Sequence, residues 1–295
     1  MSMKAWVACG VILMGVGSRA RAAVNAAWTT SIAPFRIAGN LYYVGSRDLA
    51  AYLVVTPAGD VLINSNLASS APQIEHSVEQ LGFHPRDIKV LLISHAHVDH
   101  AGGSAALLRA TGATYEVMDG DVDVVESGGR TDFAFGHGDM LFPRATVGRV
   151  LHDGDTVRLG GTELVAHKTA GHTRGCTTWT MKVMEGGRQR DVVIVGSWSV
   201  LSEYRLVATR GRRPASYPGI AADYARTFAV LQGLPGDIFL GAHGEYFDML
   251  GKLARLPQEG SSVWIDPAGY KAAVMEHRDA FERELHRQKS AGARD

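Results

Sequence analysis

The sequence has almost no cysteine, no net charge and no apolar run long enough to span a membrane. Its two cysteines are Cys9 and Cys176, and its 30 basic and 30 acidic residues give a formal net charge of zero. A neutral chain without a Lys/Arg-rich run has no electrostatic footprint for nucleic acid. Because Cys9 belongs to the N-terminal segment described next, the mature chain has one thiol and no internal disulfide. Its core, and any bound metal, must therefore stabilise it.

The first 22 residues have the pattern of a secretory signal. Lys4 provides a positive start, residues 5–17 form an apolar stretch, and Ala20-Arg21-Ala22 fits the small-x-small cleavage rule. A membrane anchor is the alternative, but the apolar stretch is shorter than the roughly 20 residues that a spanning helix needs. We therefore expect a signal peptide over 1–22, one folded domain over 23–295, and a periplasmic protein without a membrane segment after cleavage.

The rest of the chain alternates between strand and helix patterns. Short apolar runs predict strands at residues 41–44, 51–55, 61–63, 90–93, 114–118, 157–159, 163–167, 177–183, 192–195 and 237–240. Helical spacing is found at residues 71–81, 103–110, 119–126, 221–231, 247–253 and 267–288. Gly59-Asp60 is expected to form a hairpin turn, and residues 129–144 a loop. Two groups of strands with flanking helices predict an α/β fold in which two sheets pack face to face.

A stretch directly after the strand at 90–93 has the composition of a metal site. It reads Ser94-His95-Ala96-His97-Val98-Asp99-His100-Ala101-Gly102-Gly103. His95 and His97 alternate along an extended turn and can share one metal, whereas Asp99 and His100 follow where the chain bends. Imidazole and carboxylate ligands without thiolate are typical of hydrolytic Zn²⁺. A solvated His-rich loop is the alternative, but it accounts for neither the preceding strand nor the acid.

Two zinc sites need further ligands, and two later histidines have a suitable setting. His172 lies in Gly171-His172-Thr173 between two strands, and His243 lies in Gly241-Ala242-His243-Gly244 after a strand. A lone histidine of this kind is more often structural, but beside the first motif both are expected to be ligands. His137 is a candidate for the mouth of the site. We interpret the remaining histidines as surface, loop or core residues: His76, His84, His152, His167, His277 and His286.

Together, the HxHxDH run, Gly-His-Thr and Gly-Ala-His resemble the metallo-β-lactamase superfamily over nearly all of residues 35–256. The resemblance implies a single-domain αββα sandwich, with 23–295 as the catalytic domain. Many different hydrolases share this fold, so the fold alone does not name a substrate. Thioesterases, lactonases and ribonucleases of the superfamily usually carry an Asp after the Gly of an apolar strand. Here Gly196 is followed by Ser197-Trp198-Ser199, with neither that Asp nor the Cys of subclass 1 β-lactamases.

In lacking both the Asp and the Cys at this position, the chain is similar to class B β-lactamases of subclass 3. The stretches that resemble the same subclass are 94–97, 128–133, 152–155, 171–179, and 240–243 with Tyr246-Phe247 behind it. Val98 stands where the subclass often has an aromatic residue. The disulfide of some members is absent. Neither difference affects an expected ligand.

The resemblance implies two Zn²⁺ ions per chain. The ligands of the first ion would be His95, His97 and His172. The ligands of the second ion would be Asp99, His100 and His243. Ser197 would hold a water near the second zinc, and Ser199 would contact the carboxylate of the substrate.

The implied activity is hydrolysis of the β-lactam amide of penicillins, cephalosporins and carbapenems, which gives antibiotic resistance. A metal-bound hydroxide would attack without an acyl-enzyme, and Asp99 would be catalytic by orienting it and passing on its proton. The expected partner is a small β-lactam, and we expect a monomer. Which β-lactam class is preferred depends on the loop at 133–142 and on Trp198. The alternatives are another hydrolase of the fold, a lactonase or thioesterase, and a non-catalytic periplasmic zinc-binding protein.

Overall fold

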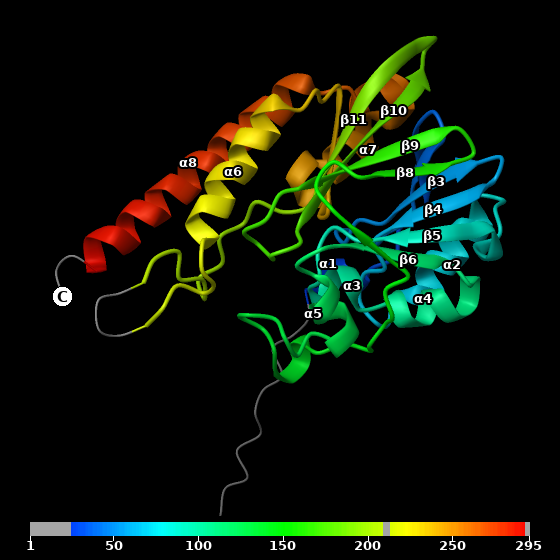
Figure 1. The fold of residues 1–295 in the computed structure, drawn as a ribbon. Helices are drawn as coiled ribbons and strands as arrows, with labels where there is room; N and C mark the ends of the chain where they lie inside the picture. The colour runs from blue at the N-terminus through cyan, green and yellow to red at the C-terminus, as the bar shows by residue number, and fades with distance from the viewer. Residues whose placement is uncertain (1–24, 209–212, 293–295) are drawn as a thin grey trace, which may run out of the picture.

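In the computed structural model, which describes residues 25–208 and 213–292, two β-sheets pack face to face between two layers of helices (Figure 1). One sheet has seven strands in the order β1-β2-β3-β4-β5-β6-β7, and the other has five in the order β12-β11-β10-β9-β8. This is the single-domain αββα sandwich that the motifs predict. The expected signal peptide over 1–22 lies outside the described residues.

The first sheet comes from the N-terminal half of the chain. Its strands are β1 (Phe35–Ala38), β2 (Leu41–Tyr43), β3 (Tyr52–Thr56), β4 (Gly59–Ile63), β5 (Ile88–Leu92), β6 (Thr114–Met118) and β7 (Arg149–Leu151). β1 to β4 are antiparallel, and β4 to β7 are parallel. The helices of this half are α1 (Ala26–Thr29), α2 (Ala71–Gln80), α3 (Val98–Ala101), α4 (Ser104–Thr111) and α5 (Val122–Ser127).

The second sheet comes from the C-terminal half. Its strands are β8 (Thr156–Leu159), β9 (Thr162–Lys168), β10 (Thr177–Glu185), β11 (Arg188–Val195) and β12 (Ile238–Gly241). β8 to β11 are antiparallel, and β12 is parallel to β11. The helices α6 (Ile220–Gly233), α7 (Met249–Glu259) and α8 (Pro267–Gly292) lie on the outer side of this sheet (Figure 1).

Neighbouring residues on the central strands point to two different apolar layers. Val54 and Ile63 face the layer between the sheets, where they meet side chains such as Trp179. Leu53 and Leu62 belong to the layer beneath the helices of the N-terminal half. Because side chains of a strand alternate between its faces, a sheet covered on both sides needs apolar residues at consecutive positions. This explains the continuous apolar runs in the sequence.

The structure corrects the expected hairpin turn at Gly59-Asp60. Pro57 and Ala58 form the turn, while Gly59 pairs with Thr56 as the first residue of β4. Gly59 still has a φ of +116°, so the conformation that favours glycine lies one residue beyond the turn. The strands β1 and β7 and the short helix α1 were not expected from the sequence.

The helix α8 is less polar on one face than its sequence suggests. Its buried side chains include Tyr270, Val274 and Phe281, which are four and seven residues apart and therefore share a face. Phe281 stacks on Tyr224 and Phe228 of α6, with ring centroids 5.4 and 5.7 Å away. Among the described residues, no helix combines the length and the apolar character needed to cross a membrane.

Candidate metal centre

Three chain segments at strand ends bring the expected ligands to one edge of the sandwich. They are the β5–α3 segment, the loop between β9 and β10, and the residues directly after β12. The side chains that they supply are His95, His97, Asp99, His100, His172 and His243. Because β5 runs parallel to β4, and β12 parallel to β11, both sheets present carboxyl ends of parallel strands. Such ends are the usual place for sites in open α/β sheets.

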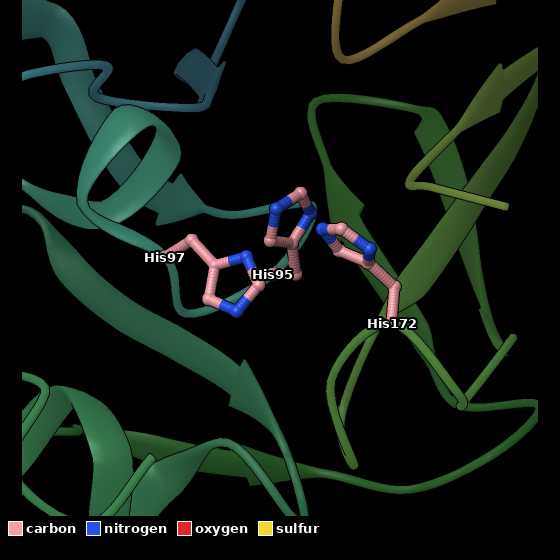
Figure 2. Close-up of side chains that lie close together, drawn as sticks. All are labelled: His95, His97 and His172. Atoms are coloured by element: carbon pink, nitrogen blue, oxygen red, sulfur yellow. The ribbon is translucent and has the colours of Figure 1, made fainter. Parts of the chain in front are cut away.

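The three histidines expected to share the first zinc face one another. One ring nitrogen from each of His95, His97 and His172 lies within 4.8 Å of the other two. Figure 2 shows that His95 and His97 approach from one loop and His172 from another. Their ring centroids are separated by 4.6 to 4.9 Å. All three residues are buried, so the rings meet away from bulk water.

The three residues expected to share the second zinc also lie together. Asp99 Oδ2 is 3.2 Å from His100 Nε2 and 3.5 Å from His243 Nε2, and the two imidazole nitrogens are 3.2 Å apart. Asp99 and His100 also group with His95 within 4.8 Å, so the two clusters adjoin. All six expected ligand side chains therefore lie next to one another, with His95 in reach of both groups.

Outer contacts orient several of these imidazoles. His172 Nδ1 donates to the carbonyl oxygen of Ser199 at 2.9 Å, and His243 Nδ1 donates to Asp48 Oδ2 at 3.0 Å. His97 Nε2 lies 3.5 Å from Asp132 Oδ2, which is long for a hydrogen bond. Histidines that bind metal usually donate their second ring nitrogen to a carbonyl or carboxylate in this way.

The electrostatics of the first cluster fit a metal cation. Burial, together with the neighbouring imidazoles, lowers the pKa of His95 well below its usual value and lowers that of His172 to about 3. Both rings are therefore neutral at pH 7 and have a lone pair to donate. In this cluster, His95 Nδ1 and His97 Nε2 are buried and have no hydrogen-bond partner among the described residues. Packing neutral imidazoles together with unpaired nitrogens is costly unless a cation lies between them.

The second cluster contains an ionised carboxylate. Burial raises the pKa of Asp99, but its contacts with His100 and His243 outweigh burial and place the pKa well below its usual range. Burial lowers the pKa of His243, yet hydrogen bonds with Asp48 and Asp99 raise it to about 9. The carboxylates of Asp48 and Asp99 therefore favour a positive charge beside His243. Imidazoles with an ionised carboxylate and no thiolate are a donor set that suits Zn²⁺.

Asp121, which the sequence analysis did not single out, ties the loops of the first cluster together. Its carboxylate accepts from the backbone N–H of Ala96 at 2.9 Å, from the Thr173 hydroxyl at 2.8 Å and from the backbone N–H of Gly175 at 2.8 Å. Ala96 lies between His95 and His97 in the chain, and Thr173 follows His172. Burial raises the pKa of Asp121 to about 6 despite these hydrogen bonds. In the sequence, Asp121 falls within the predicted helix at 119–126, where an acid gives no sign of this role.

Replacement of Asp121 by alanine is expected to lower the free energy of unfolding by about 3 kcal/mol or more. The change leaves buried N–H groups at Ala96 and Gly175 without acceptors, and each such group costs about 1–3 kcal/mol. Urea unfolding at neutral pH measures the loss. Asp123→Ala, at an exposed position of α5, is the matched control and should stay within about 0.5 kcal/mol of the unaltered protein. Equal stability of the two variants would show that other contacts hold these loops.

The two serines expected at the site follow β11 and differ in accessibility. Ser197 is buried, and its hydroxyl lies 3.3 Å from the Tyr246 hydroxyl. Ser199 is half-buried, and its carbonyl oxygen accepts from Tyr224 Oη at 2.7 Å as well as from His172. The backbone of Ser199 thus has a structural contact that the sequence did not reveal.

The loop after α5 contributes an aromatic wall. The Phe135 ring lies 5.3 Å from the His97 ring, and Phe133 contacts Tyr204 at 5.1 Å. Tyr204 Oη donates to the carbonyl oxygen of His172 at 2.7 Å. His137, a candidate for the mouth of the site, is exposed on this loop. His137 belongs to no metal-ligating group among the described residues. The same holds for the six histidines interpreted as surface, loop or core residues.

Comparisons with known proteins show which family the chain is similar to. The family model described as the metallo-beta-lactamase superfamily matches residues 48–243. The solved FEZ-1 metallo-beta-lactamase from Legionella gormanii is 48% identical, with a TM-score of 0.85, and the match covers 88% of this chain and 98% of that chain. LRA-12, a class B3 di-zinc metallo-beta-lactamase from an Alaskan soil metagenome, is 37% identical, with a TM-score of 0.82 and coverage of 89% and 98%.

A third solved structure is more distant but matches over the same length. BJP-1 of Bradyrhizobium japonicum, a subclass B3 metallo-beta-lactamase, is 32% identical, with a TM-score of 0.80 and coverage of 90% of this chain and 98% of that chain. The chain belongs to the metallo-β-lactamase superfamily, and within it to subclass B3.

Proposed function

We propose that this protein uses two zinc ions to hydrolyse the amide bond of β-lactam antibiotics, and that it thereby confers resistance to them. The observation that carries the proposal is the pair of adjoining, largely buried donor sets, one of three imidazoles and one of two imidazoles with a carboxylate. The relatives named as subclass B3 metallo-β-lactamases support it, because they match the chain over nearly their whole length.

Two separate donor sets are the basis for a count of two zinc ions. We assign the first ion to His95, His97 and His172. We assign the second ion to Asp99, His100 and His243. When bound, zinc supplies Lewis acidity and makes water acidic enough to act as a nucleophile at neutral pH.

Asp99 is the residue that we assign to proton transfer. Its carboxylate is ionised, and both His100 and His243 contact its Oδ2. A carboxylate held in this way can take a proton from the attacking water and pass it to the ring nitrogen when the amide bond breaks. We assign Ser199, which is half-buried and therefore reachable, to the carboxylate of the substrate, and Ser197 to an ordered water near the second ion.

No acyl-enzyme is needed in this mechanism. Among the described residues at the site, Ser197 contacts a tyrosine hydroxyl rather than a base, and Cys176 is fully buried with the pKa of its thiol raised by burial. A covalent inhibitor directed at nucleophilic serines is therefore expected to leave turnover unchanged and to form no adduct detectable by intact-protein mass spectrometry. An adduct on Ser197 would contradict the assignment.

Another hydrolase activity of the same fold is the second candidate. A lactonase or thioesterase is disfavoured because Ser197 stands where those enzymes usually have the Asp described above. Turnover of nitrocefin and a carbapenem should be compared with turnover of a homoserine lactone and a glutathione thioester. The proposal expects kcat/KM to be highest for the β-lactams. A zinc-loaded protein that turns over only the lactone or the thioester would overturn it.

We further propose that residues 1–22 are an export signal and that the mature chain, 23–295, acts as a periplasmic monomer. The N-terminal pattern of Lys4, an apolar stretch and Ala20-Arg21-Ala22 supports export. Mass spectrometry of protein recovered from the periplasm would test the cleavage site, and analytical ultracentrifugation would test the oligomeric state.

A further inference from the structure

The short helix α1 places an indole beside the second donor set. Trp28 Nε1 donates to Asp48 Oδ2 at 3.1 Å, and the Trp28 ring centroid lies 5.9 Å from that of His243. Trp28 is half-buried, and Asn25 caps its helix by accepting from the Ala27 N–H at 3.0 Å. An N-terminal segment remote in sequence thus lies against the edge of the site.

Asp48 connects this indole to a ligand. Its Oδ2 accepts both from Trp28 Nε1 and from His243 Nδ1, the latter at 3.0 Å, while its Oδ1 accepts from the backbone N–H of Glu245 at 3.1 Å. The carboxylate is only 13% exposed, so water does not readily replace these donors. Its orientation is therefore set by three contacts, and Trp28 supplies one of them.

The backbone around Asp48 is held between α1 and the His243 loop. On one side, Arg47 N–H donates to Thr30 O at 2.8 Å, and the Ser46 hydroxyl donates to Ala27 O at 3.2 Å. On the other side, Gly244 N–H donates to Asp48 O at 2.7 Å. Residues 46–48 thus connect the segment that carries Trp28 to the loop that carries His243.

We infer that Trp28 is a positioning residue of the second zinc site, acting through Asp48 on the orientation of His243. The inference rests on the two-zinc site proposed above. Outer partners that fix a ligating imidazole typically change metal affinity by 10- to 100-fold when they are removed. Trp28 fixes the partner of such an imidazole, so its effect should fall at the lower end of that range and should be confined to the second ion.

Zinc affinity measured by chelator competition on the mature protein tests the inference without relying on turnover. Trp28→Phe keeps an aromatic ring but loses the donor, and should weaken the second zinc about 10-fold while leaving the first unchanged. Asp48→Asn should weaken the second zinc by about 10- to 100-fold. Trp264→Phe is the matched control, because this buried indole N–H has no partner in the described structure. It should leave both affinities unchanged.

The double variant decides whether Trp28 acts through Asp48. If it does, Trp28→Phe combined with Asp48→Asn should weaken the second zinc no more than Asp48→Asn alone, since residues in one network are not additive. Equal zinc affinity of Trp28→Phe and the unaltered protein, or fully additive losses, would overturn the inference. Failure of the unaltered protein to bind a second zinc would instead contradict the two-zinc site itself.

Discussion

Replacing Asp99 with asparagine is expected to lower kcat for β-lactam hydrolysis by about 10²- to 10⁴-fold, the usual contribution of a positioned proton-transfer group. Asparagine keeps the size of the side chain but cannot take a proton. Asp99 is ionised although it is buried, because His100 and His243 lie 3.2 and 3.5 Å from its Oδ2. No other described carboxylate contacts both of these imidazoles. Stopped-flow hydrolysis of nitrocefin at saturating zinc measures the effect.

The same change at an exposed carboxylate provides the control. Asp123→Asn on α5 should leave kcat unchanged, because Asp123 faces solvent. Zinc content should be measured for both variants, so that loss of proton transfer is separated from loss of metal. A zinc-loaded Asp99→Asn variant with kcat within a few-fold of the unaltered protein would assign proton transfer to another group.

Replacing His100 with alanine is expected to reduce bound zinc from two ions to one. His100 is fully buried, and its Nε2 lies 3.2 Å both from Asp99 Oδ2 and from His243 Nε2. Removal of a direct ligand should lower the affinity for the second zinc by more than roughly 100-fold, the upper value for loss of an outer partner. Elemental analysis after dialysis against buffered zinc measures the stoichiometry.

An exposed histidine serves as the control for this change. His76 is exposed on α2 and belongs to no metal-ligating group among the described residues, so His76→Ala should retain two zinc ions. Retention of two ions by His100→Ala, at unchanged affinity, would contradict the assignment of His100 to the second site.

The expected ligands were predictable because their pattern is local. His95, His97, Asp99 and His100 fall within six residues after a buried strand, and the glycines around His172 and His243 mark strand ends. The structure brings all six side chains close together. The order of the strands decides which loops meet at the site. The strands that precede these loops are predictable, because each contains a short apolar run.

The supporting residues were not predictable, because their roles depend on contacts far apart in sequence. Asp48 and His243 are 195 positions apart, and Asp121 and Thr173 are 52 apart. A single acid in a loop carries no local sign of such a partner. The same reason explains Trp28, which is an isolated aromatic residue until the fold places it beside Asp48.

The missed secondary structure has local physical causes. β7 is a three-residue edge strand with two exposed positions, so it lacks the apolar run that marks buried strands. β1 also has one exposed residue among four. The hairpin between β3 and β4 turns at Pro57-Ala58, whereas Gly59 and Asp60 extend the strand. The glycine that suggests the turn is therefore the first residue of β4 to pair.

Two-zinc catalysis is tested most directly by β-lactam hydrolysis by the mature protein after chelation and after zinc is restored. EDTA is expected to abolish fast turnover of nitrocefin and a carbapenem, and turnover should return as two zinc ions are bound per chain. Full activity of the metal-free protein, or two bound zinc ions without β-lactam turnover, would contradict it.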